Sequence, residues 1–104
     1  MRRDKYFIEF LERIKSLLSR LNFKGTVYLF GSSVRDDYKK TSDIDLAVST
    51  SDKKLVTLLK YELEELPIPY KIDLLDLEEV GEELKKEILN HGILIWKNLN
   101  DLPY

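Results

Sequence analysis

The sequence LFGSSVRDDYKKTSDIDLAV spans residues 29–48 and joins two predicted strands through a polar loop. The first strand, Thr26–Phe30, is short, β-branched and aromatic, which is typical of a buried strand. The second strand, Asp43–Val48, carries two carboxylates with one residue between them. Because alternate residues of a strand point to the same face, Asp43 and Asp45 are predicted to project together.

Two carboxylates about 7 Å apart on one strand face repel each other, and near an apolar sheet they also lose hydration. On stability grounds alone this is a poor arrangement. A bound divalent cation would turn this repulsion into a favourable interaction, because hard oxygen ligands at this spacing suit Mg²⁺. The simpler alternative is a strand with one solvent-facing side, and it is the commoner explanation of an isolated Asp-x-Asp pattern.

The residues before the loop favour a ligand site. Gly31 ends a buried strand, where a residue without Cβ lets the backbone approach a ligand closely. Ser32 and Ser33 add hydroxyls, and a helical turn starting here would offer free N–H groups to an anion. The alternative is an ordinary strand-to-helix turn with a serine cap. The Walker A pattern is absent, which excludes that route to phosphate binding.

A third acid, Asp73, lies in the apolar middle of YKIDLLDL, the predicted strand Tyr70–Leu77. If this strand neighbours the second, the Asp73 carboxylate joins the other pair. Acids around two ions about 3.5–4 Å apart recur in enzymes that catalyse displacement at phosphorus. Asp76 is the local competitor, and its place beyond the apolar middle predicts a solvated strand end.

The rest of the chain alternates helices and strands. Apolar spacing predicts an amphipathic helix from Asp4, the expected N-cap, to Leu21. We expect an α/β (α+β) fold in which helices cover a small mixed sheet of three to four strands. Residues 97–104 are predicted to be a loose tail. The other predicted elements are helices at Lys53–Leu66 and Glu79–Asn90 and a short strand at Ile93–Trp96.

Composition limits the kind of protein. At 104 residues the chain is predicted to form one domain, residues 1–104. With 43% apolar and 35% charged residues, a globular protein is expected. No apolar run approaches the roughly 18 residues that span a bilayer, so no membrane is expected. MRRDKYFIEF lacks an apolar signal core, so we expect no export and a cytoplasmic location.

Charge and cysteine content exclude further classes of site. The chain has no cysteine, which excludes disulfides and thiolate metal sites. Its net charge is −2 with no block of basic residues, which argues against an extended nucleic acid as partner. A single nucleotide is still compatible with this composition as a ligand, because a bound metal ion can neutralise its negative charge.

The stretch GSSVRDDYKKTSDID fits a known signature: Gly-Ser, a spacer of ten residues, then Asp-x-Asp. With the later strand acid, it resembles the DNA polymerase beta nucleotidyltransferase superfamily. Over nearly its full length the chain resembles the smallest members, the minimal nucleotidyltransferases of prokaryotes. The resemblance implies a polymerase-beta-like nucleotidyltransferase fold and the transfer of a nucleoside monophosphate to a hydroxyl.

The resemblance also implies roles for the three acids. Asp43 and Asp45 would hold two Mg²⁺ ions. Asp73 would complete the shell of the catalytic ion and is a candidate for helping to deprotonate the acceptor hydroxyl.

Nucleotide binding is implied for the segment that begins at Gly31. Gly31 and Ser32 would bind the β- and γ-phosphates of a nucleoside triphosphate, with ATP expected as the substrate. Ser33 belongs to the same segment, and Arg35 resembles a basic residue that is common in the family's loop.

The loop also departs from the family pattern. Members often carry arginine directly after Gly-Ser, where this chain has Ser33, and a glycine is frequent where it has Asp36-Asp37. The added acids would repel phosphates. Lys39 and Lys40 could compensate, although loop lysines are more commonly only solvated.

The resemblance points to a partner. Minimal nucleotidyltransferases are commonly encoded beside HEPN-domain proteins, with which they form toxin–antitoxin pairs. In that picture the transferase moves AMP from ATP onto a tyrosine of the HEPN ribonuclease and silences it. Two alternatives stay open: neutralisation of the HEPN partner by occlusion with little turnover, and transfer to a small molecule such as an antibiotic. A homo-oligomer also stays open.

Several aromatic or titratable residues have structural interpretations. His91, beside Gly92, is predicted to cap a helix C-terminus or to be exposed rather than to act in catalysis. Trp96 is expected to pack rather than to stack on a base. The aromatic residues near the start of the first helix are predicted core, with a possible partner surface on its rim: Tyr6, Phe7 and Phe10.

Overall fold

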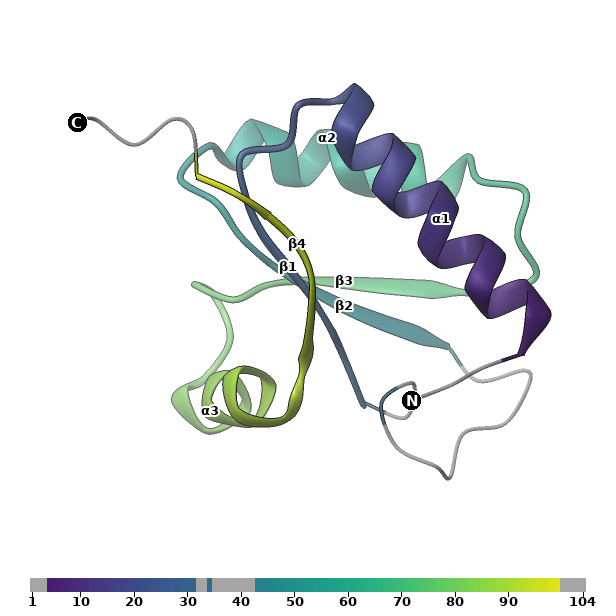
Figure 1. The fold of residues 1–104 in the computed structure, drawn as a ribbon. Helices are drawn as coiled ribbons and strands as arrows, with labels where there is room; N and C mark the ends of the chain where they lie inside the picture. The colour runs from purple at the N-terminus through teal and green to yellow at the C-terminus, as the bar shows by residue number, and fades with distance from the viewer. Residues whose placement is uncertain (1–3, 32–33, 35–42, 100–104) are drawn as a thin grey trace.

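The computed structural model describes residues 4–31, 34 and 43–99. Ser32, Ser33, Arg35 and the rest of the loop lie outside the described residues, as do the predicted helical turn after Gly31 and the end of the tail. None of the helices within the described ranges is long and apolar enough to cross a bilayer. The elements, in order, are α1 Lys5–Arg20, β1 Gly25–Phe30, β2 Ile44–Ser49, α2 Lys53–Glu64, β3 Ile72–Asp76, α3 Glu82–His91 and β4 Ile93–Asn98 (Figure 1).

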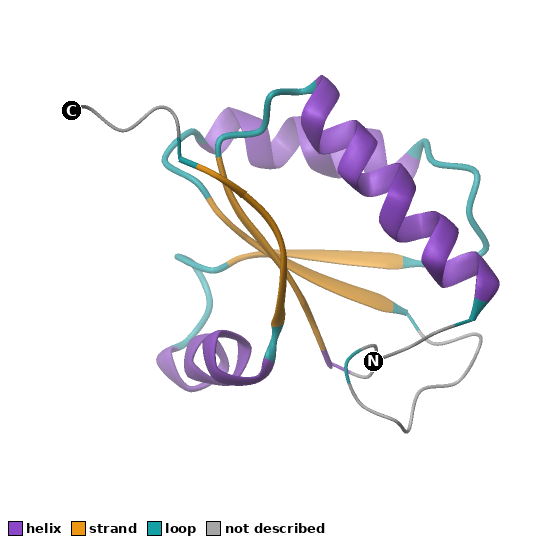
Figure 2. Cartoon of the chain, viewed as in Figure 1, coloured by secondary structure: helices purple, strands orange, loops and turns teal. Residues whose placement is uncertain are grey.

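The four strands form one mixed sheet in the order β3-β2-β1-β4. Figure 2 shows this sheet with helices on both of its sides. β1 pairs antiparallel with both β2 and β4, whereas β2 and β3 run parallel. Parallel neighbours need a crossover, and α2 supplies it. The predicted mixed sheet covered by helices is therefore confirmed.

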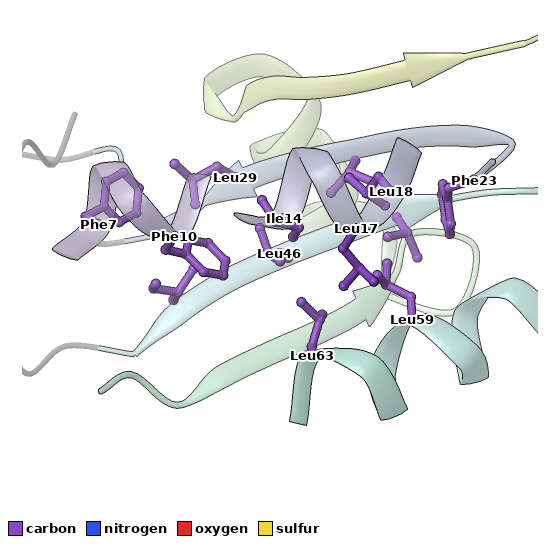
Figure 3. Close-up of a cluster of buried hydrophobic side chains, with 13 residues drawn as sticks. Phe7, Phe10, Ile14, Leu17, Leu18, Phe23, Leu29, Leu46, Leu59 and Leu63 are labelled. Atoms are coloured by element: carbon purple, nitrogen blue, oxygen red, sulfur yellow. The ribbon is translucent and has the colours of Figure 1, made fainter. Parts of the chain in front are cut away.

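α1 forms as its apolar spacing predicts. Asp4 caps it, because Oδ2 of Asp4 accepts a hydrogen bond from the backbone N–H of Phe7 at 3.2 Å. The helix buries one stripe against the sheet (Figure 3): Phe7, Phe10, Ile14, Leu17 and Leu18. Tyr6 is 59% exposed, so the prediction that it joins the core is wrong: it lies off the buried stripe.

The two faces of the sheet are covered unequally. α1 and α2 cover one face, where alternate strand residues such as Leu29 and Leu46 are fully buried (Figure 3). α3 lies on the opposite side of the sheet (Figure 1), where Ile88 packs with Ala47 and Leu77. Because these contacts lie toward the ends of β2 and β3, α3 does not cover the beginnings of the two strands.

Some element boundaries differ from the predictions. β2 begins at Ile44, so Asp43 immediately precedes the strand. β3 is shorter than predicted, Ile72–Asp76, because its ladder with β2 runs only from Ile72 to Asp76. α3 begins later than predicted, after Gly81, its N-cap.

β4 is longer than predicted and takes in the first residues of the expected loose tail. It continues to Asn98, because the ladder with β1 extends to the pair Gly25 and Asn98. Nε1 of Trp96 donates a hydrogen bond to the carbonyl of Phe23 at 3.0 Å, which confirms that Trp96 packs. Nδ2 of Asn98 donates to Oδ1 of Asn22 at 3.2 Å. Lys97 and Asn98 are therefore held in the sheet.

Candidate active site

Gly31 directly follows β1 and lies against Asp45. Its φ is 74°, in the left-handed region that favours glycine. A Cβ added at this position would collide with the carboxylate of Asp45. The chain therefore needs glycine here for two reasons, its backbone conformation and the space that the carboxylate occupies.

Strand register brings Asp73 next to Asp45. Asp45 pairs with Phe30 of β1 on one side and with Asp73 of β3 on the other. Paired residues of neighbouring strands, about 4.8 Å apart, point to the same face of a sheet. The third strand therefore does lie beside the second, which is the condition under which Asp73 is expected to join the other acids. The two half-buried carboxylates share the part of the face that α3 does not cover.

Asp43 stands just outside this pair. It is exposed, and the ladder between β2 and β3 begins one residue later, where the N–H of Ile44 donates to the carbonyl of Lys71 at 2.9 Å. Within the described ranges, no three His, Cys, Asp or Glu side chains are grouped so that they could hold a metal ion together. The carboxylates of Asp45 and Asp73 suit a hard cation such as Mg²⁺. The three-acid magnesium site stays a prediction.

A hollow of about 380 Å³ lies beside the two acids. It follows the outer edge of β3, which is the edge strand of the sheet. Ile72 and Leu74 pack toward the α1–α2 core, whereas Asp73, between them in the strand, belongs to the opposite face. Lys60 of α2 also lines it, which sequence reasoning missed because nothing local places this exposed helix residue near β3. The lining residues are Phe30, Asp45, Lys60, Ile72, Asp73, Leu74 and Leu75.

A second hollow, of about 410 Å³, lies at the end of β1. It borders Gly31 and lies between the end of β1 and the C-terminus of α3. The lining residues are Phe30, Gly31, Val34, Glu87, His91 and Gly92. His91 is exposed and is the last residue of α3, as predicted, but it also lines this hollow.

Asp76 is not the solvated strand end that the sequence predicted. Its side chain is 8% exposed, and its carboxylate accepts hydrogen bonds from Nζ of Lys53 at 2.9 Å and from the N–H of Glu78 at 3.0 Å. Burial acts to raise the pKa of Asp76, but these hydrogen bonds and the charge of Lys53 together lower it. Asp76 therefore serves as an anchor for α2.

This anchor is part of a small network away from the acid pair. The hydrogen bond to Asp76, with the nearby charges of Asp76 and Glu78, raises the pKa of Lys53. Nζ of Lys53 also lies 3.8 Å from Glu78, whose carboxylate accepts a hydrogen bond from the Ser49 hydroxyl at 3.1 Å. These contacts join the start of α2 to the ends of β2 and β3.

Comparison with known proteins identifies the family of the chain. The model of a family described as polymerase beta, nucleotidyltransferase matches residues 12–101. That range includes Gly31 and all three predicted metal-binding acids.

One curated relative comes from Haemophilus influenzae and is named "Probable protein adenylyltransferase MntA". It is 37% identical over 91 residues, which cover 84% of this chain and 79% of the relative.

Solved structures are similar over most of the chain. One is a toxin–antitoxin complex with AMP-PNP, in which a chain matches with a TM-score of 0.61 and 27% identity, covering 88% of this chain and 76% of that one. Another is a tri-AMPylated Shewanella oneidensis HEPN toxin in complex with MNT antitoxin. A chain of that complex matches with a TM-score of 0.54 and 26% identity, covering 88% and 72%.

Proposed function

Because the chain belongs to the polymerase beta nucleotidyltransferase family, we propose that it transfers AMP from ATP, with Mg²⁺, to a tyrosine hydroxyl of a HEPN-domain partner. In this role it acts as the antitoxin of a toxin–antitoxin pair. The relative named as an adenylyltransferase and the similarity to a chain of the AMPylated HEPN complex support the choice of group and partner. The observation that carries the proposal is the pairing of Asp45 with Asp73 beside Gly31.

Asp45 and Asp73 supply the oxygen ligands that Mg²⁺ prefers, and Asp43 stands one residue before β2 to extend the set. Bound Mg²⁺ would stabilise negative charge on the attacking and departing oxygens. The strands fix the two acids through backbone hydrogen bonds, so the ligands need little rearrangement when nucleotide binds.

The reaction balances as a displacement at the α-phosphorus of ATP. The tyrosine oxygen forms a bond to this phosphorus, the bond to the β-phosphate oxygen breaks, and pyrophosphate leaves. We propose that Asp73, on the edge strand β3, receives the hydroxyl proton. Gly31 leaves its backbone open to the phosphates beside Asp45, and Ser32, Ser33 and Arg35 are proposed to contact them further along the chain.

A labelling experiment tests the proposal. The protein is incubated with ATP labelled on the α-phosphate, Mg²⁺ and the product of the adjacent gene, the expected HEPN partner, and we expect label on that protein. Asp45→Asn is expected to abolish labelling, as is replacement of the accepting partner tyrosine by phenylalanine. Asp52→Asn is the matched control, because asparagine can replace aspartate as the N-cap of α2.

The same experiment separates catalysis from occlusion. If the Asp45→Asn protein still binds the HEPN partner and still neutralises it, the antitoxin acts by covering its partner's surface and the transfer proposal fails. If label reaches a small hydroxyl compound and never the partner protein, the acceptor assignment is wrong.

A further inference from the structure

The end of α3 is fixed against the end of β1. Ile88 is fully buried against the sheet, and the N–H of Gly92 donates to the carbonyl of Ile88 at 2.7 Å. A Cβ at Gly92 would collide with that carbonyl and would lie 3.2 Å from the carbonyl of Leu29. The absence of a side chain at Gly92 therefore lets the helix end close to the strand, where β4 pairs with β1.

Two polar residues of α3 line the second hollow. Glu87 and His91 are one helical turn apart, so they share a face of α3. Both line the hollow of about 410 Å³ together with Phe30 and Gly31. That volume falls within the roughly 300–1,000 Å³ of small-molecule sites.

The hollow adjoins the acid pair. Phe30 lines both hollows, and Gly31, which lies against Asp45, borders the second one. A nucleotide with its phosphates beside Gly31 and Asp45 would thus have its other end within reach of α3.

The charge of Glu87 determines which end of a nucleotide can bind in the second hollow. The carboxylate of Glu87 repels phosphates and accepts hydrogen bonds from N–H groups. The imidazole of His91 offers ring nitrogens for hydrogen bonding, and Phe30 offers an aromatic face of the kind on which bases stack. These groups match the polar edge and the flat face of a base that carries an amino group.

On the basis of the proposed function, we propose that the hollow between α3 and the end of β1 holds the nucleobase of ATP. Glu87 accepts a hydrogen bond from the exocyclic amine, and His91 contacts a ring nitrogen. Glu87 and His91 are specificity residues in this arrangement, and they take no part in the chemical step.

Nucleotide titration of the full chain tests this inference without a partner protein. Calorimetry in Mg²⁺ compares ATP with purine riboside triphosphate, which is ATP without its 6-amino group. The unmodified protein is expected to bind ATP about tenfold more tightly, the scale of one hydrogen bond to a charged group. Glu87→Ala should lower the affinity for ATP about tenfold and should change the affinity for purine riboside triphosphate by no more than about twofold.

Matched variants on the same helix serve as controls. Glu83→Ala removes an equivalent exposed carboxylate outside the hollow and should change neither affinity. His91→Ala should weaken the binding of both nucleotides, whereas Asn90→Ala should leave the binding of both unchanged. Alanine favours helix, so these variants should fold, which circular dichroism checks. Glu87→Gln, which keeps the side-chain shape, should show a smaller loss for ATP than Glu87→Ala.

The outcomes separate the two proposals. If Glu87→Ala behaves like Glu83→Ala while ATP still binds through Asp45, the base site is wrong and the proposed function stands. If neither nucleotide binds the unmodified protein in Mg²⁺, or if Asp45→Asn leaves binding unchanged, both proposals fail. If Glu87→Ala raises the KM for the partner protein and leaves the affinity for ATP unchanged, the hollow receives the acceptor and the inference is overturned.

Discussion

Asp45 and Asp73 are partners in the parallel ladder between β2 and β3, so two acidic side chains project from neighbouring strands on the same face of the sheet. Like charges at paired positions destabilise a sheet. On like-charge grounds alone the pair is therefore a poor arrangement, and it is the feature that we assign to catalysis.

The first prediction separates the effect of the acid pair on stability from its effect on catalysis. Asp73→Asn is expected to raise the free energy of unfolding by about 0.5 kcal/mol in a chelating buffer, because it removes one of two adjacent like charges. The same change should lower AMP transfer at least about 100-fold, because a metal ligand and proton acceptor are lost. Urea unfolding and the labelling assay measure the two quantities. An unchanged transfer rate would remove Asp73 from the site.

The second prediction concerns Gly31. Gly31→Ala places a Cβ in the left-handed region and against the carboxylate of Asp45, so the free energy of unfolding should fall by at least about 2 kcal/mol. ATP binding should weaken as well. Gly81→Ala is the control, because a Cβ there meets nothing within 4 Å. Equal unfolding midpoints for the two variants would contradict the steric argument.

The third prediction follows from the pKa of Asp76, which lies below its usual value in the folded protein. A lowered folded pKa means that the stabilisation is present above the unfolded value, about 4, and is lost as pH falls through the folded one. Because Lys53 is half exposed, we expect about 1 kcal/mol or less. Asp76→Asn should flatten the loss of stability below about pH 4, as measured by urea midpoints from pH 7 downward. A parallel decline in both proteins would contradict this assignment.

The fourth prediction concerns the start of α1. The hydroxyl of Tyr70 donates a hydrogen bond to Oδ2 of Asp4 at 2.5 Å and so joins the segment before β3 to the N-cap of the helix. Tyr70→Phe should lower the free energy of unfolding by about 1 kcal/mol. Tyr61→Phe, at a side chain that is 60% exposed, should have almost no effect. Thermal denaturation of both variants checks the difference.

Local signals in the sequence were sufficient for much of the fold. The apolar spacing and the Asp4 cap predicted α1, and the strand pattern around Asp45 predicted β2, because these features depend on neighbours a few residues away. The same pattern predicted that Asp45 and Asp73 would meet if their strands paired, and they do.

Other features depend on tertiary contacts and could not be predicted in this way. The burial of Asp76 depends on Lys53 reaching it from α2. The length of β4 depends on its partner β1, which extends the pairing to Asn98. Glu87 and His91 lie near Gly31 only because β4 pairs on the far side of β1 from β2.

The parallel pairing of β2 and β3 makes the spacing of the two acids independent of the length of the segment that connects them. Residues 65–71 could gain or lose length without moving Asp73, provided that Ile72 still pairs with Ile44. A slip of one residue would instead turn Asp73 toward α2 and expose an apolar neighbour in its place. The length of the crossover can therefore change in evolution while the backbone ladder keeps the acids aligned.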